Sequence, residues 1–401
     1  MIPSARPRIE PAVPPMLLQQ RFRASPDYRL VAHADLPEED RRHFAPLAED
    51  PEHFGLLVPV SCVQSGVKAV GAELARLFGA LSRPGALPPE VVRAPHPRLN
   101  ARLAGLVLDG VLEVELDGAF ASGPAAGPLL AGPGSPAARA HPLSALSRAA
   151  LRLAWSVPTE DPAQLSGWIY GFNAVPLGPA WLRRLGSAER WLELIGLHDG
   201  GRNHRRVASG YHETPHPAWH GWTRRTGAPG AAQHLGYKLY VSPHPRVLVE
   251  AFDGVLDVLL AEQVPAFKLG KGPAGVLRPD KLVVYLDGWE SLHALALRLE
   301  AALAGVPAQG VPFTAPLSED ALLSWGMDPP PHARLRGYGP IESWRLWLSN
   351  QLARAVLHAR SRGADADQAL AYASTRLRLE GVDTGLWIPE DALWAEEGVP
   401  A

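Results

Sequence analysis

The segment from Tyr237 to Leu286 places lysines inside apolar runs that are typical of β-strands. It reads YKLYVSP, then a stretch with helical periodicity, then VPAFKLG and RPDKLVVYL. A lysine in a half-buried strand loses part of its hydration, which lowers the pKa of its ammonium group and makes the amine usable as a base. The segment therefore predicts a small sheet whose lysines take part in catalysis.

The periodicity of this region predicts an α+β fold with a small mixed sheet and flanking helices. The expected elements are strand Tyr237–Ser242, helix Pro245–Glu262, strand Val264–Leu269, strand Lys281–Leu286 and helix Trp289–Ala304. Two more helices, over Glu342–Arg362 and Asp365–Glu380, are expected to close the chain. Earlier helices are expected over Leu143–Ala154 and Pro179–Gly196.

A change in composition indicates a domain boundary near residue 140. All twelve tryptophans lie at or beyond Trp155, and the stretch from Gly118 to Leu143 is rich in Ala, Gly and Pro, as linkers are. We therefore expect an N-terminal module over 1–122, a linker over 123–141 and a C-terminal domain over 142–401.

The N-terminal part is expected to form a winged-helix-like module. Helical periodicity covers Val67–Leu81 and Arg98–Leu108, and Asp117-Gly118 then separates two short strands, a strong hairpin signal. Such a module recognises DNA or a peptide strand, or is a small packing domain. DNA is disfavoured because the candidate recognition helix carries only Arg98 and Arg102 as basic residues.

Composition and charge limit the expected cellular location and the expected binding partners. The chain has 401 residues, 46% of them hydrophobic and 20% charged, which is ordinary for globular domains. The formal net charge of −2 gives no overall attraction to nucleic acid or to an anionic membrane, so neither is an expected partner. The single cysteine, Cys62, forms no internal disulfide, and no signal peptide or long apolar run is evident, so we expect a cytoplasmic protein.

The stretch from Gly200 to Arg225 is polar and rich in Gly and Pro, so we expect a long loop there. His212, His216 and His220 are spaced four apart, but Pro215 and Pro217 argue against the helix that would align them. We therefore expect solvated histidines and no metal site.

Strand alternation predicts which residues meet. Lys238 and Tyr240 share one face of their strand, and Lys268 points opposite to Phe267 and Leu269. If the strands pair, Lys238, Tyr240 and Lys268 project from one face, and Arg278 and Lys281 approach from the RPDK turn. Residues 200–286 carry eleven basic and six acidic side chains, a local charge of +5 that suits a phosphate dianion. The alternative is structural, because lysines also protect strand edges and basic loops are often only solvated surface.

These motifs resemble the phosphothreonine/phosphoserine lyase segment of class III and IV lanthipeptide synthetases. They are similar also to the HopA-type family of type III effectors and to its relatives in class V lanthipeptide and thioamitide pathways. The resemblance implies that Lys268 is the base that removes the α-proton, while Lys238 and Arg278 hold the phosphate; we add Lys281 to the phosphate-binding candidates. Tyr240 stands where the family has a histidine general acid, so Tyr240 donates the proton, Lys238 does, or the acid step is lost.

The expected function is therefore β-elimination of phosphate from a phosphorylated peptide during maturation of a ribosomal peptide, with no metal or organic cofactor. The partner is a peptide substrate or leader peptide, and a separate kinase supplies the phosphate because the chain has no kinase motif. The alternatives are a non-catalytic scaffold that keeps the fold and an effector-like protein that binds a partner protein.

Overall fold

The computed structural model describes residues 15–60, 66–93, 99–131, 140–225, 236–334, 342–390 and 393. The chain forms two compact units, which we describe separately. The sheet unit comprises residues 1–10, 134–357 and 380–401, and the N-terminal unit comprises 11–133 and 358–379. One boundary between the units, at residues 133–134, lies within the range predicted as a linker, and residues 358–379 of the predicted C-terminal domain group with the N-terminal unit. Cys62 lies outside the described residues.

The sheet unit is built on an antiparallel seven-stranded sheet in the order β12-β13-β9-β11-β10-β8-β7. Its strands are β7 (Tyr211–Thr214), β8 (Trp219–Arg224), β9 (Tyr237–Val241), β10 (Ala266–Gly270), β11 (Leu282–Leu286), β12 (Ala315–Pro316) and β13 (Leu323–Met327). The predicted strands are confirmed within a few residues, and β11 lies between β9 and β10.

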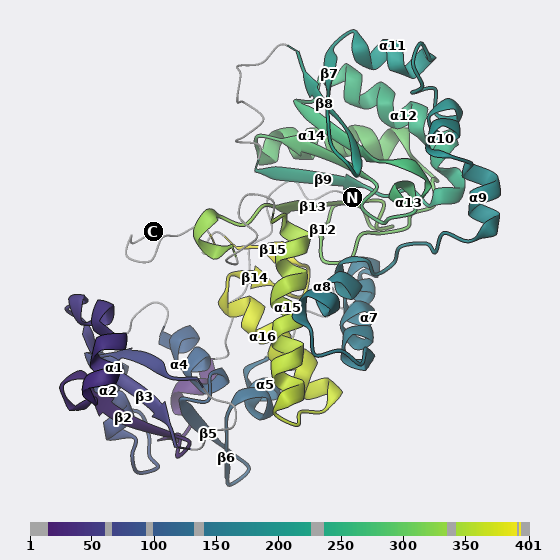
Figure 1. Cartoon of the computed structure of the whole chain (residues 1–401). Coiled ribbons are helices and arrows are strands. Elements are labelled where there is room, and N and C mark those ends of the chain that lie inside the picture. Colours follow the sequence, from purple (N-terminus) through teal and green to yellow (C-terminus); the bar gives the residue numbers. More distant parts are fainter. Residues whose placement is uncertain are drawn as a thin grey trace. The chain divides into compact units, whose positions relative to one another are not determined.

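Two amphipathic helices cover one face of this sheet, α12 (Leu248–Ala261) and α14 (Trp289–Ala302) (Figure 1). Along α12, apolar residues recur at helical spacing and are buried, among them Phe252, Leu256 and Leu259. They pack on side chains from the strands and form the main core. Burial of this face stabilises the sheet and holds the opposite face in position.

The remaining helices of the sheet unit surround the sheet. They are α7 (Pro142–Ser156), α8 (Pro162–Tyr170), α9 (Pro179–Leu185), α10 (Ala188–Leu194), α11 (Arg202–Ala208), α13 (Gly272–Val276) and most of α15 (Trp344–Ser361), and a two-stranded sheet adds β14 (Val382–Asp383) and β15 (Ile388–Pro389). The helix predicted over Pro179–Gly196 is broken at Gly186, whose φ of +70° ends α9. Among the helices that the structure describes, none is long and apolar enough to cross a bilayer.

The long loop expected over Gly200–Arg225 is wrong, because this stretch forms helix α11 and the β7–β8 hairpin. Its aromatic residues explain the error: Tyr211, Trp219 and Trp222 are each less than a tenth exposed, and their burial outweighs the local Gly and Pro content. The prolines are confined to the turn between the two strands.

The N-terminal unit contains two three-stranded sheets, β1-β5-β6 and β2-β3-β4. Its strands are β1 (Phe22–Ala24), β2 (Tyr28–Ala32), β3 (His53–Pro59), β4 (Lys68–Gly71), β5 (Leu112–Leu116) and β6 (Ala119–Ala121). Its helices are α1 (Glu38–His43), α2 (Ala72–Ala80), α3 (Pro89–Arg93), α4 (Leu99–Leu108), α5 (Gly127–Leu130) and α16 (Ala366–Leu379). The two units together confirm a mixed α+β class.

The structure tests three local predictions for this unit: the hairpin, the start of a helix and the linker. The hairpin at Asp117-Gly118 is confirmed, since both residues have positive φ, +49° and +81°, and β5 pairs with β6. The helix expected from Val67 begins only at Ala72, because Lys68–Gly71 pair with β3. Part of the predicted linker forms helix α5, which packs against α16.

Candidate active site

The strand registers place the candidate residues on one face of the seven-stranded sheet. Lys268 lies opposite Val283, and Val283 lies opposite Tyr240 on the next strand. Lys238 lies opposite Tyr285. Because directly opposed residues of antiparallel strands point to the same side, Lys238, Tyr240 and Lys268 all project away from α12 and α14, as alternation predicts.

Lys268 is half-buried, and its ammonium group lies on aromatic rings. Its Nζ is 4.3 Å from the ring centroid of Trp219 and 5.4 Å from that of Tyr285. Within the described residues it forms no hydrogen bond and no ion pair. Burial lowers the pKa of Lys268 to about 8, and the nearby Lys238 charge adds to this effect. About one amine in ten is therefore neutral at pH 7.

Lys238 is paired with Asp328, a residue that the sequence did not indicate. The Nζ of Lys238 lies 2.5 Å from the Asp328 carboxylate, and only 7% of the lysine side chain is exposed. The same carboxylate oxygen accepts a hydrogen bond from the backbone N–H of Trp344, at the start of α15. Asp328 therefore fixes the position of Lys238 relative to this helix.

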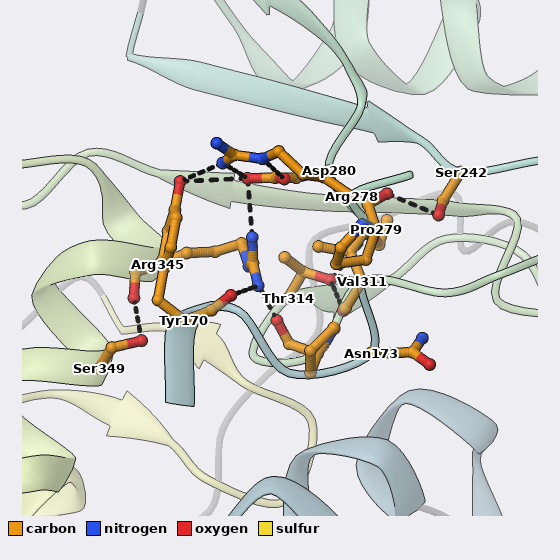
Figure 2. Close-up of polar contacts among 12 residues, drawn as sticks. Tyr170, Asn173, Ser242, Arg278, Pro279, Asp280, Val311, Thr314, Arg345 and Ser349 are labelled. Carbon is orange, nitrogen blue, oxygen red and sulfur yellow. Dashed lines mark hydrogen bonds and ion pairs between the residues drawn. The ribbon is translucent and has the colours of Figure 1, made fainter. Parts of the chain in front are cut away.

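A buried carboxylate, Asp280, joins two arginines (Figure 2). Arg278 donates from Nε and Nη2 to the two Asp280 oxygens, each at 2.9 Å, and Arg345 Nη1 lies 2.7 Å from Oδ2. Burial alone would raise the pKa of Asp280, but the Arg345 and Arg278 guanidinium groups hold it well below its usual range. Burial alone would lower the pKa of Arg278, and Asp280 raises it instead. Arg278 therefore stays charged.

Tyr170, the last residue of α8, forms hydrogen bonds with Asp280 and with both arginines. Its hydroxyl accepts a hydrogen bond from Arg278 Nη2 at 2.8 Å and donates one to Asp280 Oδ2 at 3.1 Å. Its backbone oxygen accepts from Arg345 Nη2 at 2.8 Å. Burial, and then the Asp280 charge, raise the pKa of the Tyr170 phenol, so the phenol stays neutral. Arg278 is thus held by three hydrogen bonds, and 28% of its side chain is exposed.

The charges of this cluster do not cancel. Four cations face two carboxylates, which leaves two positive charges when Lys268 is protonated; the six side chains are Lys238, Lys268, Arg278, Arg345, Asp280 and Asp328. A phosphate ester dianion carries the complementary charge and offers three acceptor oxygens; when Lys268 is neutral, one excess positive charge remains to hold it. The cluster is therefore suited to a phosphorylated ligand.

The other two predicted residues have different surroundings. Tyr240 is 3% exposed, and burial followed by the Asp328 charge raises the pKa of its phenol well above 10. Lys281 is fully buried, and its ammonium donates to the Pro243 carbonyl at 3.0 Å and to Gln309 Oε1 at 2.6 Å. Burial lowers the pKa of Lys281 to about 7. The structure thus brings Lys238, Tyr240, Lys268 and Arg278 together, whereas the Lys281 ammonium is enclosed by neutral oxygens.

Sequence reasoning missed several residues of the site. Asp280 stands inside the quoted RPDK motif, where a carboxylate between two cations was a usable signal. Trp219 was hidden in the supposed loop. Tyr170, Asp328 and Arg345 approach from distant parts of the chain, and no spacing in the sequence indicates that they meet.

Comparison with known proteins gives structural neighbours alone. No family model matches the chain, and no curated protein does. An effector protein from Pseudomonas syringae pv. tomato strain DC3000 is 16% identical over 64% of this chain and 99% of its own, with a TM-score of 0.39. The type III effector/phosphothreonine lyase OspF from Shigella flexneri is 14% identical over 36% and 84%, with a TM-score of 0.26.

A third neighbour is the VirA (SpvC) phosphothreonine lyase effector of Chromobacterium violaceum, which is 15% identical over 34% of this chain and 77% of its own, with a TM-score of 0.26. The neighbours thus include phosphothreonine lyase effectors at low identity.

Proposed function

We propose that the chain removes phosphate from phosphothreonine or phosphoserine residues of a peptide by β-elimination. One observation carries the proposal: a half-buried lysine with a pKa of about 8 lies on the same sheet face as a cluster with excess positive charge. The cations would bind the phosphate, and the amine beside them would act as the base.

In the proposed reaction, the neutral amine of Lys268 takes the α-proton of the phosphorylated residue. The electron pair of the broken Cα–H bond forms the Cα=Cβ double bond, and the Cβ–O bond breaks with its electrons going to phosphate. Arg278 and Lys238 would stabilise the charge that grows on the leaving group. The products are inorganic phosphate and dehydrobutyrine or dehydroalanine; the Lys268 ammonium returns its proton to water, and the group that protonates the phosphate regains a proton from water.

Protonation of the leaving phosphate is assigned to Tyr240 in this proposal. Its high pKa keeps the phenol protonated at neutral pH, so it has a proton to donate. A phenol of such high pKa is a weak acid, however, and transfers its proton only as the leaving oxygen becomes strongly basic. Lys238, which is held by Asp328, is the second candidate for this step.

The wider role is also a proposal. The substrate would be a ribosomal peptide phosphorylated by a separate kinase, and the N-terminal unit would act as a winged-helix-like binder of its leader peptide. The resemblance of the strand motifs supports this context, and the β5–β6 hairpin supplies an element that could serve as the wing.

A second function is favoured by Tyr240 itself. Because this residue is buried and weakly acidic, the cluster also suits a protein that binds a phosphorylated peptide without cleaving it. Such a scaffold would keep the contacts of Arg278 and Lys238 and would have no need of a neutral Lys268.

A synthetic phosphothreonine peptide separates the two functions. Mass spectrometry should show loss of phosphoric acid with the wild-type chain, and Lys268→Ala should lower the rate by about a hundredfold to ten-thousandfold. Lys271→Ala, which removes an exposed lysine three residues away, is the matched control and should keep full activity. Wild-type protein that binds the phosphopeptide without eliminating phosphate would refute the lyase and support the scaffold.

A further inference from the structure

The Lys268 amine differs from those of Lys238 and Lys281, the other two lysines among the predicted site residues. Lys238 is tied to the Asp328 carboxylate, and Lys281 is fully buried and bound to two neutral oxygens. Lys268 is only half-buried, and in the described part of the chain no acceptor holds its ammonium group. Its lone pair, once formed, is therefore available for attack on an electrophile.

Aromatic rings connect this amine with the cations that would bind phosphate. The Trp219 ring lies 4.3 Å from Lys268 Nζ and 4.8 Å from Arg278 Cζ. The Tyr285 ring lies 5.4 Å from Lys268 Nζ and 5.3 Å from Lys238 Nζ. The Lys268 amine thus lies within one ring's span of two cationic groups that can hold a phosphate.

We propose that this site binds phosphorylated aldehydes covalently, with Lys268 forming an imine while Arg278 and Lys238 hold the phosphate. The inference rests on the phosphate-binding half of the proposed function and not on the elimination step. Lys268 Nζ attacks the carbonyl carbon, the carbinolamine loses water, and a C=N bond remains. The step is reversible and needs no oxidant or reductant.

Pyridoxal 5′-phosphate is a suitable probe, because it joins an aldehyde, a flat ring and a phosphate. 5′-Deoxypyridoxal, which lacks the phosphate and has no hydroxyl that closes onto the aldehyde, is its matched control. Each is incubated with the full chain, the imine is trapped with borohydride, and the modified lysine is located by peptide mass mapping. Pyridoxal 5′-phosphate should label Lys268 at a concentration at least about tenfold lower than 5′-deoxypyridoxal, the effect of one or two charge-assisted hydrogen bonds.

Competition and variants sharpen the test. Inorganic phosphate should protect Lys268 from pyridoxal 5′-phosphate and leave labelling by 5′-deoxypyridoxal unchanged. Arg278→Gln should remove most of the preference for the phosphorylated aldehyde, whereas Lys271→Met should not change it. Circular dichroism identifies any variant that fails to fold, and the comparison of the two aldehydes on the wild-type chain is independent of every variant.

Equal labelling by the two aldehydes, or equal trapping on Lys268 and Lys271, would overturn the inference. Its failure can be told apart from that of the lyase. Phosphate-directed labelling without elimination supports this inference and removes the lyase. Elimination without phosphate-directed labelling keeps the lyase and removes this inference, and the absence of both removes the two together.

Discussion

The two faces of the seven-stranded sheet are made by the same strands and have opposite properties. One face is apolar and is sealed by α12 and α14, whereas the other holds Lys238, Tyr240 and Lys268. Neighbouring residues such as Phe267 and Lys268 therefore belong to different environments, because successive side chains of a strand alternate. The comparison shows how the chain can keep a dehydrated lysine: the apolar face supplies the stability, and the opposite face carries the cost of burying charge.

Substitution of these two neighbours gives the largest expected contrast. Phe267 is 2% exposed and its ring lies 5.0 Å from that of Trp222, so Phe267→Ala should lower the free energy of unfolding by about 3–5 kcal/mol. Lys268→Met should leave the free energy of unfolding unchanged or higher and should abolish elimination. Urea unfolding and the phosphopeptide assay measure the two effects. Similar losses of stability in both variants would contradict the division of roles.

The next effect comes from the buried carboxylate. Asp280→Asn leaves the Arg345 guanidinium, whose side chain is 2% exposed, without its compensating charge, and should destabilise the fold by about 3–5 kcal/mol. The matched control is Asp257→Asn, which breaks an exposed ion pair with Arg206 and should cost no more than about 1 kcal/mol. Thermal unfolding of the two variants side by side tests this. Equal costs would show that Asp280 does not hold the arginines.

The fold was more predictable from sequence than the site, for a physical reason. Periodicity is local, so the strands around Lys238 and Lys268 and the helices between them followed from short windows. The β7–β8 hairpin was missed because the two prolines of its turn and the glycines of the surrounding stretch outweighed two buried tryptophans in the composition. The partners of the cations, by contrast, are brought together only by tertiary packing.

Alternation predicted that Lys238 and Lys268 share a face, and the registers agree. It did not show that Asp328 neutralises Lys238 or that Arg345 joins Asp280, since these pairs are separated by 90 and 65 positions in the chain. The functional roles of the predicted residues stay predictions, and the pH dependence of the reaction is one way to test them.

The rate of the proposed reaction should depend on pH through the protonation state of Lys268. Because the base is the neutral amine, the pH profile of kcat/KM should have a rising limb. This limb should level off above about 8, the pKa of Lys268 in the free protein. A bound phosphate dianion favours the charged ammonium, so the same limb in kcat should lie at higher pH. Rate measurements over a pH series give both limbs. A flat profile between pH 6 and 9 would contradict the role of Lys268 as base.

Two charge variants should move this limb in opposite directions. Lys238→Met removes a neighbouring positive charge and should shift the limb of kcat/KM to higher pH. Asp328→Asn removes a negative charge and should shift it to lower pH. A merely structural role for either residue would lower the rate without moving the limb, so the direction of the shift is the informative result.

The smallest effect should come from Tyr170, which touches the cluster through its hydroxyl. Tyr170→Phe keeps the ring and removes the hydrogen bonds to Arg278 and Asp280, which should cost about 1 kcal/mol of stability. Arg278 keeps both of its bonds to Asp280, so phosphopeptide affinity should fall only a few-fold, by the loss of one orienting contact. Isothermal titration with the phosphopeptide measures this. A loss of affinity as large as that caused by Arg278→Gln would mean that the phenol itself contacts the phosphate. Tyr170 would then be a phosphate-binding residue like Arg278 and Lys238.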